Sequence, residues 1–246
     1  MLPDEPRLLD ALDATWPAAA THRAGGFLIR EGKGGGKRVS AATRDAGTAD
    51  ARPQDIDAAI AAMRALGQTP LFMLRTVDAT LDADLAARGF AVVDPVNLYA
   101  APLDLITGEV PRVTVFDLWE PLAISAEIWA EAGIGPARLA VMQRVAGPRT
   151  ALLSRLGQMP AGTAFVACDG KVAMIHALEV RPEARRKGIA GQMMRHGAAW
   201  ARRHGAAYLA LAVTQANAGA NALYSSLGMK VVGQYHYRLA SKDPEA

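Results

Sequence analysis

Apolar residues recur along 189–204 at the spacing of one helix face, and Gly205 ends the pattern as a glycine after a helix commonly does. A continuous apolar run at 207–213 has the length of a strand. The segment 217–227 begins with an Asn that can cap a helix and is followed by a glycine, and the strand-like run 230–232 comes next. The pattern predicts the order helix, strand, helix, strand.

The first half of the chain repeats this order: a helix at 53–66, a strand at 70–74, a helix through 85–88 and a strand at 89–93. The glycines that end the two helices lie 22 residues apart here (67 and 89) and 23 apart in the second half (205 and 228). We therefore expect two related α/β domains from a fused or duplicated unit, although this order of elements also arises by chance.

A boundary is expected near 102–111, where two prolines flank a short polar stretch after a strand at 96–101. The expected domains are 1–105 and 110–246. The second domain should continue with a strand at 113–116, helices at 118–131 and 136–145, a strand at 164–168, an Asp-Gly turn and a strand at 171–180.

Of the 246 residues, 51% are hydrophobic and 21% are charged, which suffices for a large core that needs no disulfide or metal cross-link. The single cysteine, Cys168, excludes an internal disulfide, and no Cys and His residues have the spacing of metal ligands. The start lacks a signal-peptide pattern, and no run of about 18 apolar residues occurs. We expect a cytoplasmic protein with no membrane partner and no metal.

Charge is unevenly distributed, since residues 1–105 carry a formal net charge of −3 and residues 106–246 one of +6. A basic half attracts nucleic acid or a small polyanion such as a phosphorylated cofactor. No recognition-helix or base-stacking motif is found, so nucleic acid is not expected as a partner.

The basic half contains one segment with the chemistry of an anion site. The strand up to Val180 leads into Arg185-Arg186-Lys187-Gly188-Ile189-Ala190 and directly into the long helix. A glycine lets the backbone approach a ligand, and the free N–H groups and dipole of the first helical turn favour negative charge. Three consecutive cationic side chains reinforce that preference.

Together these motifs resemble the GNAT acyltransferase superfamily. Leu178-Glu179-Val180-Arg181-Pro182 is followed by Arg-x-x-Gly-x-Ala, and Asn217 and the segment 222–229 lie downstream. The resemblance covers about 112–240. It implies an α/β (α+β) fold of two GNAT-like domains, each a mixed, mostly antiparallel sheet flanked by helices. It also implies acetyl-CoA as cosubstrate, with its pyrophosphate on the loop Arg185, Arg186, Lys187, Gly188, Ile189 and Ala190.

The first domain would be a degenerate copy, because 47–53 precedes its long helix where the phosphate loop should be. Its glycine cluster at 32–37 lacks the spacing and the terminal Ser or Thr of a P-loop. We interpret the cluster as a flexible hairpin tip between strands at 27–30 and 39–42.

The resemblance also suggests roles along the cofactor. Leu178 and Val180 would offer backbone groups to the pantetheine arm and the thioester, while their side chains are ordinary core residues. Tyr224 stands where the family commonly places the proton donor for the leaving thiolate, although a tyrosine on such a helix is often only half-buried packing. Asn217 is expected to be a helix N-cap and also a partner of the pantetheine amides.

Two residues are candidates for the base that removes a proton from the amine. Simple alternation places Val172, Met174, His176 and Leu178 on one face of the strand, and His176 resembles the histidine of arylalkylamine N-acetyltransferases at this place. A lone His on an apolar strand is more often a core residue. Glu179 lies on the opposite face unless a bulge turns it inward, and it is the reserve candidate.

The expected function is transfer of an acetyl group to a primary amine of a small molecule or peptide, by direct attack in a ternary complex. The aromatic strand 234–238 is expected either to line the acceptor pocket or to be ordinary strand. The alternative is an acyl-CoA-binding sensor or interaction protein without turnover. The expected oligomeric state is a monomer or homodimer.

Overall fold

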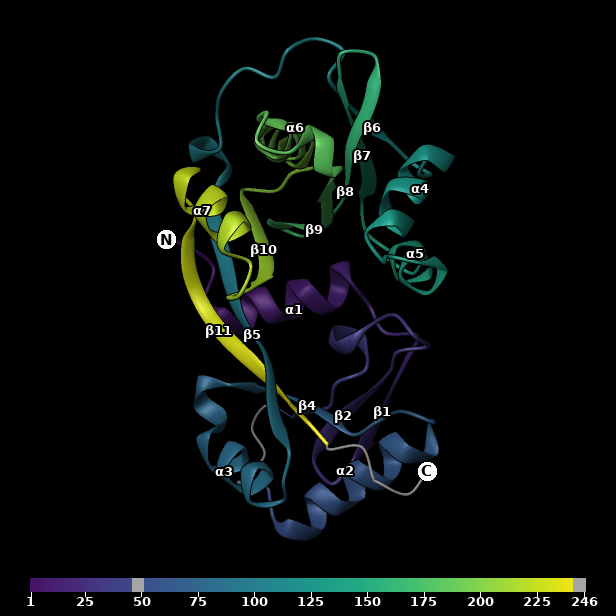
Figure 1. Ribbon diagram of the computed structural model, residues 1–246. Coiled ribbons are helices and arrows are strands. Elements are labelled where there is room, and N and C mark those ends of the chain that lie inside the picture. Colours follow the sequence, from purple (N-terminus) through teal and green to yellow (C-terminus); the bar gives the residue numbers. More distant parts are fainter. Residues whose placement is uncertain (46–50, 241–246) are drawn as a thin grey trace. The chain divides into compact units, whose positions relative to one another are not determined.

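The computed structural model describes residues 1–45 and 51–240 (Figure 1). The chain forms two compact units, and each is discontinuous in sequence. Unit 1 comprises Met1–Pro17, Asn97–Val213 and Asn217–Gly233, and unit 2 comprises Ala18–Val96, Thr214–Ala216 and the chain from Gln234 onward. Each unit therefore combines residues from both halves of the chain, so the units do not coincide with the expected segments 1–105 and 110–246.

Unit 1 is built on a sheet whose strands follow the order β11, β5, β10, β9, β8, β7, β6. Their bounds are Lys230–Leu239 (β11), Ala91–Pro102 (β5), Tyr208–Thr214 (β10), Val172–Val180 (β9), Met159–Asp169 (β8), Arg149–Leu156 (β7) and Val115–Leu118 (β6). Strands β6 to β9 pair antiparallel, whereas β9 and β10 are parallel. Strands β5 and β11 each contribute only part of their length to this unit.

Helices cover both faces of this sheet (Figure 1). Helix α6 (Ile189–Arg203) contacts β6 to β9 on one face, where Ile175 and Val166 lie close to Gly197. Helices α1 (Glu5–Thr15) and α4 (Ala123–Glu131) contact β8 and β9. Helices α5 (Pro136–Gln143) and α7 (Ala218–Ser226) and the short 3-10 helices η3 (Leu103–Leu105) and η4 (Pro182–Ala184) complete the unit.

Helix α1 was not predicted, although its sequence explains it. Asp4 caps the helix by accepting a hydrogen bond from the Arg7 backbone N–H at 3.0 Å. Its buried side chains recur at helical spacing: Leu8, Ala11, Leu12 and Thr15. A short amphipathic helix of this kind is stable only when its apolar face packs on other elements, here on β8 and β9.

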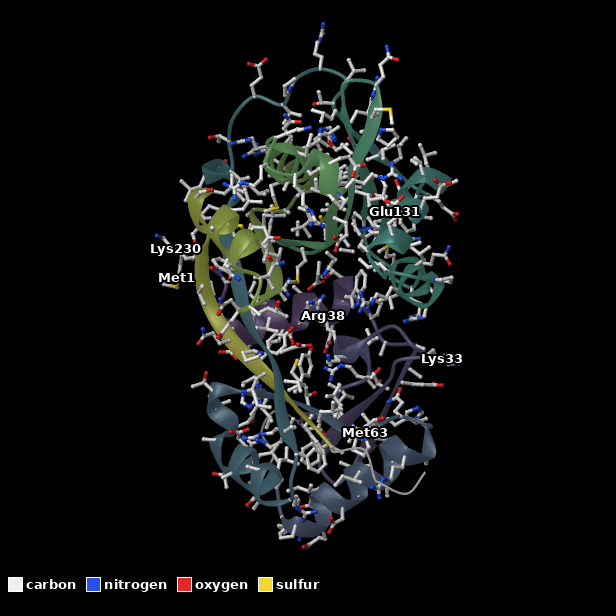
Figure 2. All side chains as sticks on the ribbon, viewed as in Figure 1. Met1, Lys33, Arg38, Met63, Glu131 and Lys230 are labelled. Atoms are coloured by element: carbon white, nitrogen blue, oxygen red, sulfur yellow. The ribbon has the colours of Figure 1, made fainter. Side chains whose placement is uncertain are left out.

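Unit 2 contains an antiparallel sheet of β1 (Ala20–Ala24), β2 (Phe27–Glu31) and β3 (Thr43–Arg44). The other elements are α2 (Pro53–Ala65), β4 (Leu71–Arg75), η2 (Thr76–Asp78) and α3 (Ala79–Ala87), and β4 pairs antiparallel with residues 235–239 of β11. The rings of Phe27, Phe72 and Phe90 form edge contacts in its core, which also holds Met63 of α2 (Figure 2).

Most of the predicted elements are present. The predicted bounds are most accurate for elements whose ends carry a capping residue or a following glycine. Helices α6 and α7 and strand β10 lie within a residue or two of their predicted bounds. The predicted strand at 39–42 is wrong. After Gly36, whose φ is 98°, the chain forms the 3-10 helix η1 (Lys37–Val39), and the N–H groups of Ser40 and Ala41 bond to the Lys37 carbonyl. The segment 47–53 lies partly outside the described residues.

Candidate functional site

The loop before α6 presents unpaired backbone donors. Gly188 is the N-cap of the helix, with a φ of 80° in the left-handed region, and no side chain caps it. The first hydrogen bond of the helical pattern is donated by the backbone N–H of Gln192 to the carbonyl oxygen of Gly188, at 3.0 Å. The N–H groups of the first helical turn therefore have no acceptor within the helix and are available to an anion.

The three cationic side chains of the loop do not behave alike. Arg185 donates its Nε–H to the Val180 carbonyl at 3.1 Å, which directs its side chain back along β9. Arg186 adopts a φ of 61°, and both arginines line a cavity beside the loop. Lys187 is not among the lining residues of this cavity. The loop thus has two arginines that can contact a ligand in this cavity.

This cavity, of about 770 Å³, lies within unit 1 between the end of β9, the loop, the first turn of α6, and α7. Ten of the predicted site residues line it: Leu178, Glu179, Val180, Arg185, Arg186, Gly188, Ile189, Ala190, Asn217 and Tyr224. His176 and Lys187 do not. A volume of this size suits a ligand of several hundred daltons.

The two parallel strands beside the cavity pair over only part of their length. Their register runs from Val172 opposite Tyr208 to Met174 opposite Ala210, and β9 then continues to Val180 and β10 to Thr214. Beyond Met174 and Ala210 the two strands are no longer in register with each other. An extended ligand with amide groups can pair with such exposed strand backbone.

A bulge in β9 changes which side chains share a face. Phe165 of β8 pairs with His176, but Thr163 pairs with Glu179, so Ala177 and Leu178 together stand opposite one residue. Ala177 has a φ of 48°. Directly opposed residues share a face, and alternation along β8 places 163 and 165 on the same side.

The simple alternation assumed from sequence is therefore wrong beyond Ala177. Because of the extra residue, Glu179 lies on the same face as His176. Leu178 and Val180 lie on the other face and pack against the core beneath α6. The bulge that the sequence analysis named as the condition for turning Glu179 inward is therefore present.

His176 is a buried and hydrogen-bonded residue of the α1 side of unit 1. Its side chain is 4% exposed, and its ring lies 5.0 Å from that of Trp16. Its Nε2 is 2.9 Å from the Thr15 hydroxyl, which itself donates to the Ala11 carbonyl at 2.6 Å. Because the only hydroxyl proton of Thr15 is used, Nε2 of His176 acts as the donor.

Glu179 and Tyr224 meet at the cavity and influence one another. Burial raises the pKa of the Glu179 carboxyl, against the opposing effect of Arg185 and Arg138. Burial, and next the negative charge of Glu179, raise the pKa of Tyr224 to about 12. A pKa of about 12 means that Tyr224 keeps its proton through the neutral pH range.

Strand β5 contributes side chains to this site that were not predicted. The ring of Tyr99 lies 5.8 Å from that of Tyr224. Asn97 donates to the Asn221 side chain at 3.0 Å, and Asn221 donates to the Asn217 carbonyl at 2.8 Å. The Asn217 side chain accepts from the Ala220 N–H at 3.1 Å, so the predicted N-cap is confirmed. No local motif marks Asn97 or Tyr99, because they lie more than 110 residues before Asn217 and Tyr224 in the sequence.

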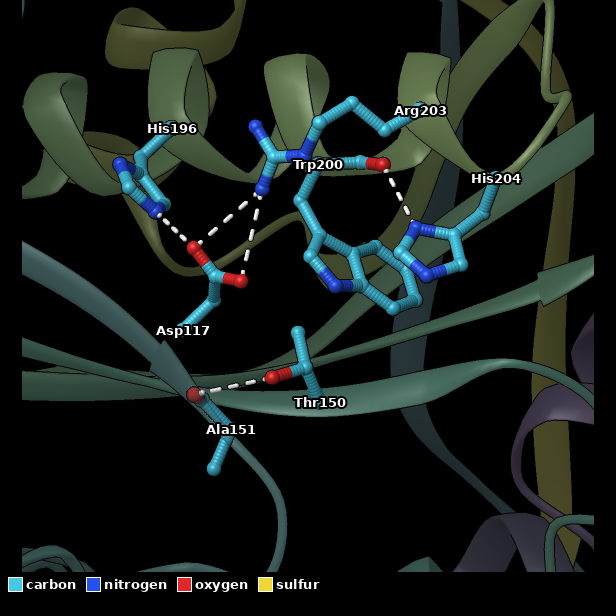
Figure 3. Close-up of polar contacts among 7 residues, drawn as sticks. All are labelled: Asp117, Thr150, Ala151, His196, Trp200, Arg203 and His204. Atoms are coloured by element: carbon cyan, nitrogen blue, oxygen red, sulfur yellow. Dashed lines mark hydrogen bonds and ion pairs between the residues drawn. The ribbon is translucent and has the colours of Figure 1, made fainter.

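Polar contacts join α6 to strand β6 at the edge of the sheet (Figure 3). Asp117 of β6 accepts from His196 at 2.6 Å and from Arg203 at 3.3 Å. The His204 ring stacks on Trp200 with centroids 4.1 Å apart. The contacts of Asp117 join α6 to β6, whereas the Trp200–His204 stack lies within the C-terminal end of α6.

Other kinds of site receive no support from the described residues. Within 1–45 and 51–240, no group of three His, Cys, Asp or Glu side chains is placed to hold a metal ion. Over the same residues, no helix is both long and apolar enough to cross a bilayer. Cys168 is buried, and burial raises the pKa of its thiol to about 11. Tyr235 and Tyr237 of the last strand are buried in unit 2 and do not line the cavity.

Comparison with known proteins agrees with this geometry. Residues 137–229 match the family model described as "Acetyltransferase (GNAT) family". A GCN5-related N-acetyltransferase from Kribbella flavida has a TM-score of 0.72 at 17% identity, covering 96% of this chain and 95% of that chain. A functionally unknown conserved protein from Staphylococcus epidermidis has a TM-score of 0.69 at 12% identity, covering 93% and 96%.

A tandem GNAT protein from the clavulanic acid biosynthesis pathway has a TM-score of 0.62 at 17% identity, covering 94% of this chain and 86% of that chain. These likenesses show the fold, which is that of two GNAT-like domains in tandem. No curated protein matches the sequence.

Proposed function

We propose that this chain is an enzyme of the GNAT acetyltransferase kind, matched by residues 137–229, and that it transfers an acetyl group from acetyl-CoA to a primary amine. The family and fold are those of acyl-transfer enzymes. The observation that most directly supports this proposal is the cavity of about 770 Å³, which is lined both by the loop before α6 and by Glu179 and Tyr224. The acceptor is proposed to be a small molecule or a peptide.

The residues present fit acetyl-CoA at two points. The unpaired N–H groups of α6 and the side chains of Arg185 and Arg186 suit a pyrophosphate. The edge of β9 that is no longer in register with β10 beyond Met174 suits the amides of a pantetheine arm. When bound, acetyl-CoA supplies a thioester carbonyl that an amine can attack directly.

Glu179 is the proposed base, because it lines the cavity whereas His176 does not. Its carboxylate takes the proton that the amine loses as the carbon–nitrogen bond forms, and its raised pKa brings it nearer to working pH. Tyr224, which remains protonated, gives its hydroxyl proton to the thiolate as the carbon–sulfur bond breaks. The proton held by Glu179 then returns to solvent, and solvent reprotonates Tyr224.

Isotopic acetyl transfer and thiol release over a panel of primary amines test this function, with acetyl-CoA binding measured by calorimetry. We expect saturable binding that weakens as ionic strength rises, because the loop is cationic. We also expect thiol release that depends on the amine. Absence of binding to any acyl-CoA would contradict the proposal. Binding without thiol release over a broad panel would favour the acyl-CoA sensor instead.

A further inference from the structure

A buried tryptophan of α4 contacts the backbone of the bulge in β9. The indole N–H of Trp129 donates to the carbonyl oxygen of Ala177 at 2.8 Å. The Trp129 side chain is fully buried, so its N–H cannot turn to water instead. This bond joins an element 48 residues away in sequence to the one residue of β9 with a left-handed backbone.

The bulge needs such a partner for two reasons. A left-handed backbone is disfavoured for a residue with a side chain, and Ala177 has a φ of 48°. The extra residue of a bulge is also left out of the strand ladder, so its polar groups must find acceptors or donors elsewhere. Trp129 supplies a donor to the carbonyl, which favours the bulged conformation over regular pairing.

The bulge in turn decides which residue faces the reaction. Thr163 stands opposite Glu179 only because Ala177 and Leu178 share one position on β8. Regular pairing would exchange the faces of Leu178 and Glu179. Helix α4 also holds the chain just after β9, since Glu131 accepts two hydrogen bonds from Arg181, at 2.6 and 2.9 Å.

We propose that Trp129 is a positioning residue for the acyl transfer, because its indole N–H stabilises the Ala177 bulge that orients Glu179. This inference rests on the proposed function. Trp129 does not line the cavity, so it acts through the strand and not on the substrate.

Steady-state kinetics of Trp129→Phe, which removes the N–H and keeps an aromatic ring, test the inference. We expect kcat to fall about 10- to 100-fold, the cost of a misplaced reacting group. The Kd of acetyl-CoA should change much less, since the loop is intact. The pH at which the rate rises should also shift, because Glu179 has left its site.

Two further variants separate positioning from packing. Ala177→Gly in the Trp129→Phe background should restore part of kcat and the wild-type pH dependence, because glycine adopts a positive φ freely. The matched control is Trp200→Phe, at another buried tryptophan of unit 1 (Figure 3). It should lower stability and leave kcat within about twofold. If Trp129→Phe fails to fold, benzothienylalanine at 129 removes the N–H and keeps the shape.

The outcomes are distinct. Loss of kcat with rescue by glycine at 177 supports the inference. Wild-type kcat and pH dependence in the Trp129 variant overturn it, and so does a loss that glycine does not restore and Trp200→Phe reproduces. If the wild-type chain neither binds acetyl-CoA nor releases thiol, the proposed function itself fails, and the inference with it.

Discussion

At the scale of single residues, the cavity combines a carboxyl that ionises late with a phenol that does not ionise in the working range. Burial raises the pKa of Glu179, and burial and the Glu179 charge raise the pKa of Tyr224 to about 12. A base must be deprotonated and an acid protonated at the same pH: the raised pKa of Tyr224 keeps the acid protonated through neutral pH, and the raised pKa of Glu179 moves the lower pH limit of the base upward. The pair is thus suited to opposite proton transfers.

The pH dependence of the rate provides a test at this scale. The rate should rise with pH through the raised pKa of Glu179, because only the carboxylate accepts a proton. Glu179→Gln should lower kcat about 100- to 1,000-fold and abolish this rise. His176→Gln keeps a donor for Thr15, so it should lower stability and leave the rise in place. If pH–rate profiles show instead that His176→Gln abolishes the rise and Glu179→Gln leaves it in place, the base is His176.

Local motifs predict some of these residues and not others. Asn217, Tyr224 and the loop follow from short spacings that one helix or turn determines. The face of Glu179 does not, because the bulge depends on Trp129 and on pairing with β8. Simple alternation therefore places Leu178 on the same face as His176. The bulge at Ala177 and Leu178 reverses this order, so that Glu179 shares the face of His176 instead.

At the scale of elements, the junction of the loop and α6 depends on one backbone conformation. Gly188 has a φ of 80°, and a Cβ added there would meet nothing within 4 Å. Any effect of a side chain at this position is therefore backbone strain and not a clash. Gly205, after the other end of α6, has a φ of 83° and is equally open.

These two glycines make a matched pair of variants. Gly188→Ala and Gly205→Ala should each lower the free energy of unfolding by about 1 kcal/mol, measured by urea denaturation. Only Gly188→Ala should also weaken acetyl-CoA binding in calorimetry, because it alone distorts the backbone N–H donors proposed to bind the phosphates. Equal affinities in the two variants would argue against a ligand at this loop.

Elements with strong end signals are the ones that the sequence predicts well. Helices α6 and α7 have a clear start and a glycine after their end, and both are found as expected. Helix α1 and strand β7 were not predicted, since their stability comes from packing on distant strands. The 3-10 helix η1 replaces a predicted strand because Gly36 turns the chain before it.

At the scale of the whole molecule, the compact units do not follow the order of the sequence. Unit 1 takes α1 from the start of the chain and residues 97–102 of β5 from its middle. Unit 2 takes the last residues of β11. Two similar halves in sequence therefore did not reveal which segments fold together, because periodicity reports elements and not their partners.

A truncated chain tests this arrangement. The fragment 110–246 lacks α1, with its buried Leu8 and Leu12, and the Tyr99 ring that contacts Tyr224. Loss of two buried leucines alone costs about 4 to 10 kcal/mol, comparable with the stability of a domain. We expect no cooperative unfolding of the fragment in urea, followed by tryptophan fluorescence. A transition as steep as that of the intact chain would contradict this expectation.

The dependence of unit 1 on α1 has a consequence for biosynthesis. Thr15 leaves the ribosome long before Val180 completes the strands on which its helix packs. At roughly 5 to 20 residues per second, the apolar face of α1 waits on the order of ten to thirty seconds for that partner. The nascent chain thus exposes the apolar face of α1 until β8 and β9 have been synthesised.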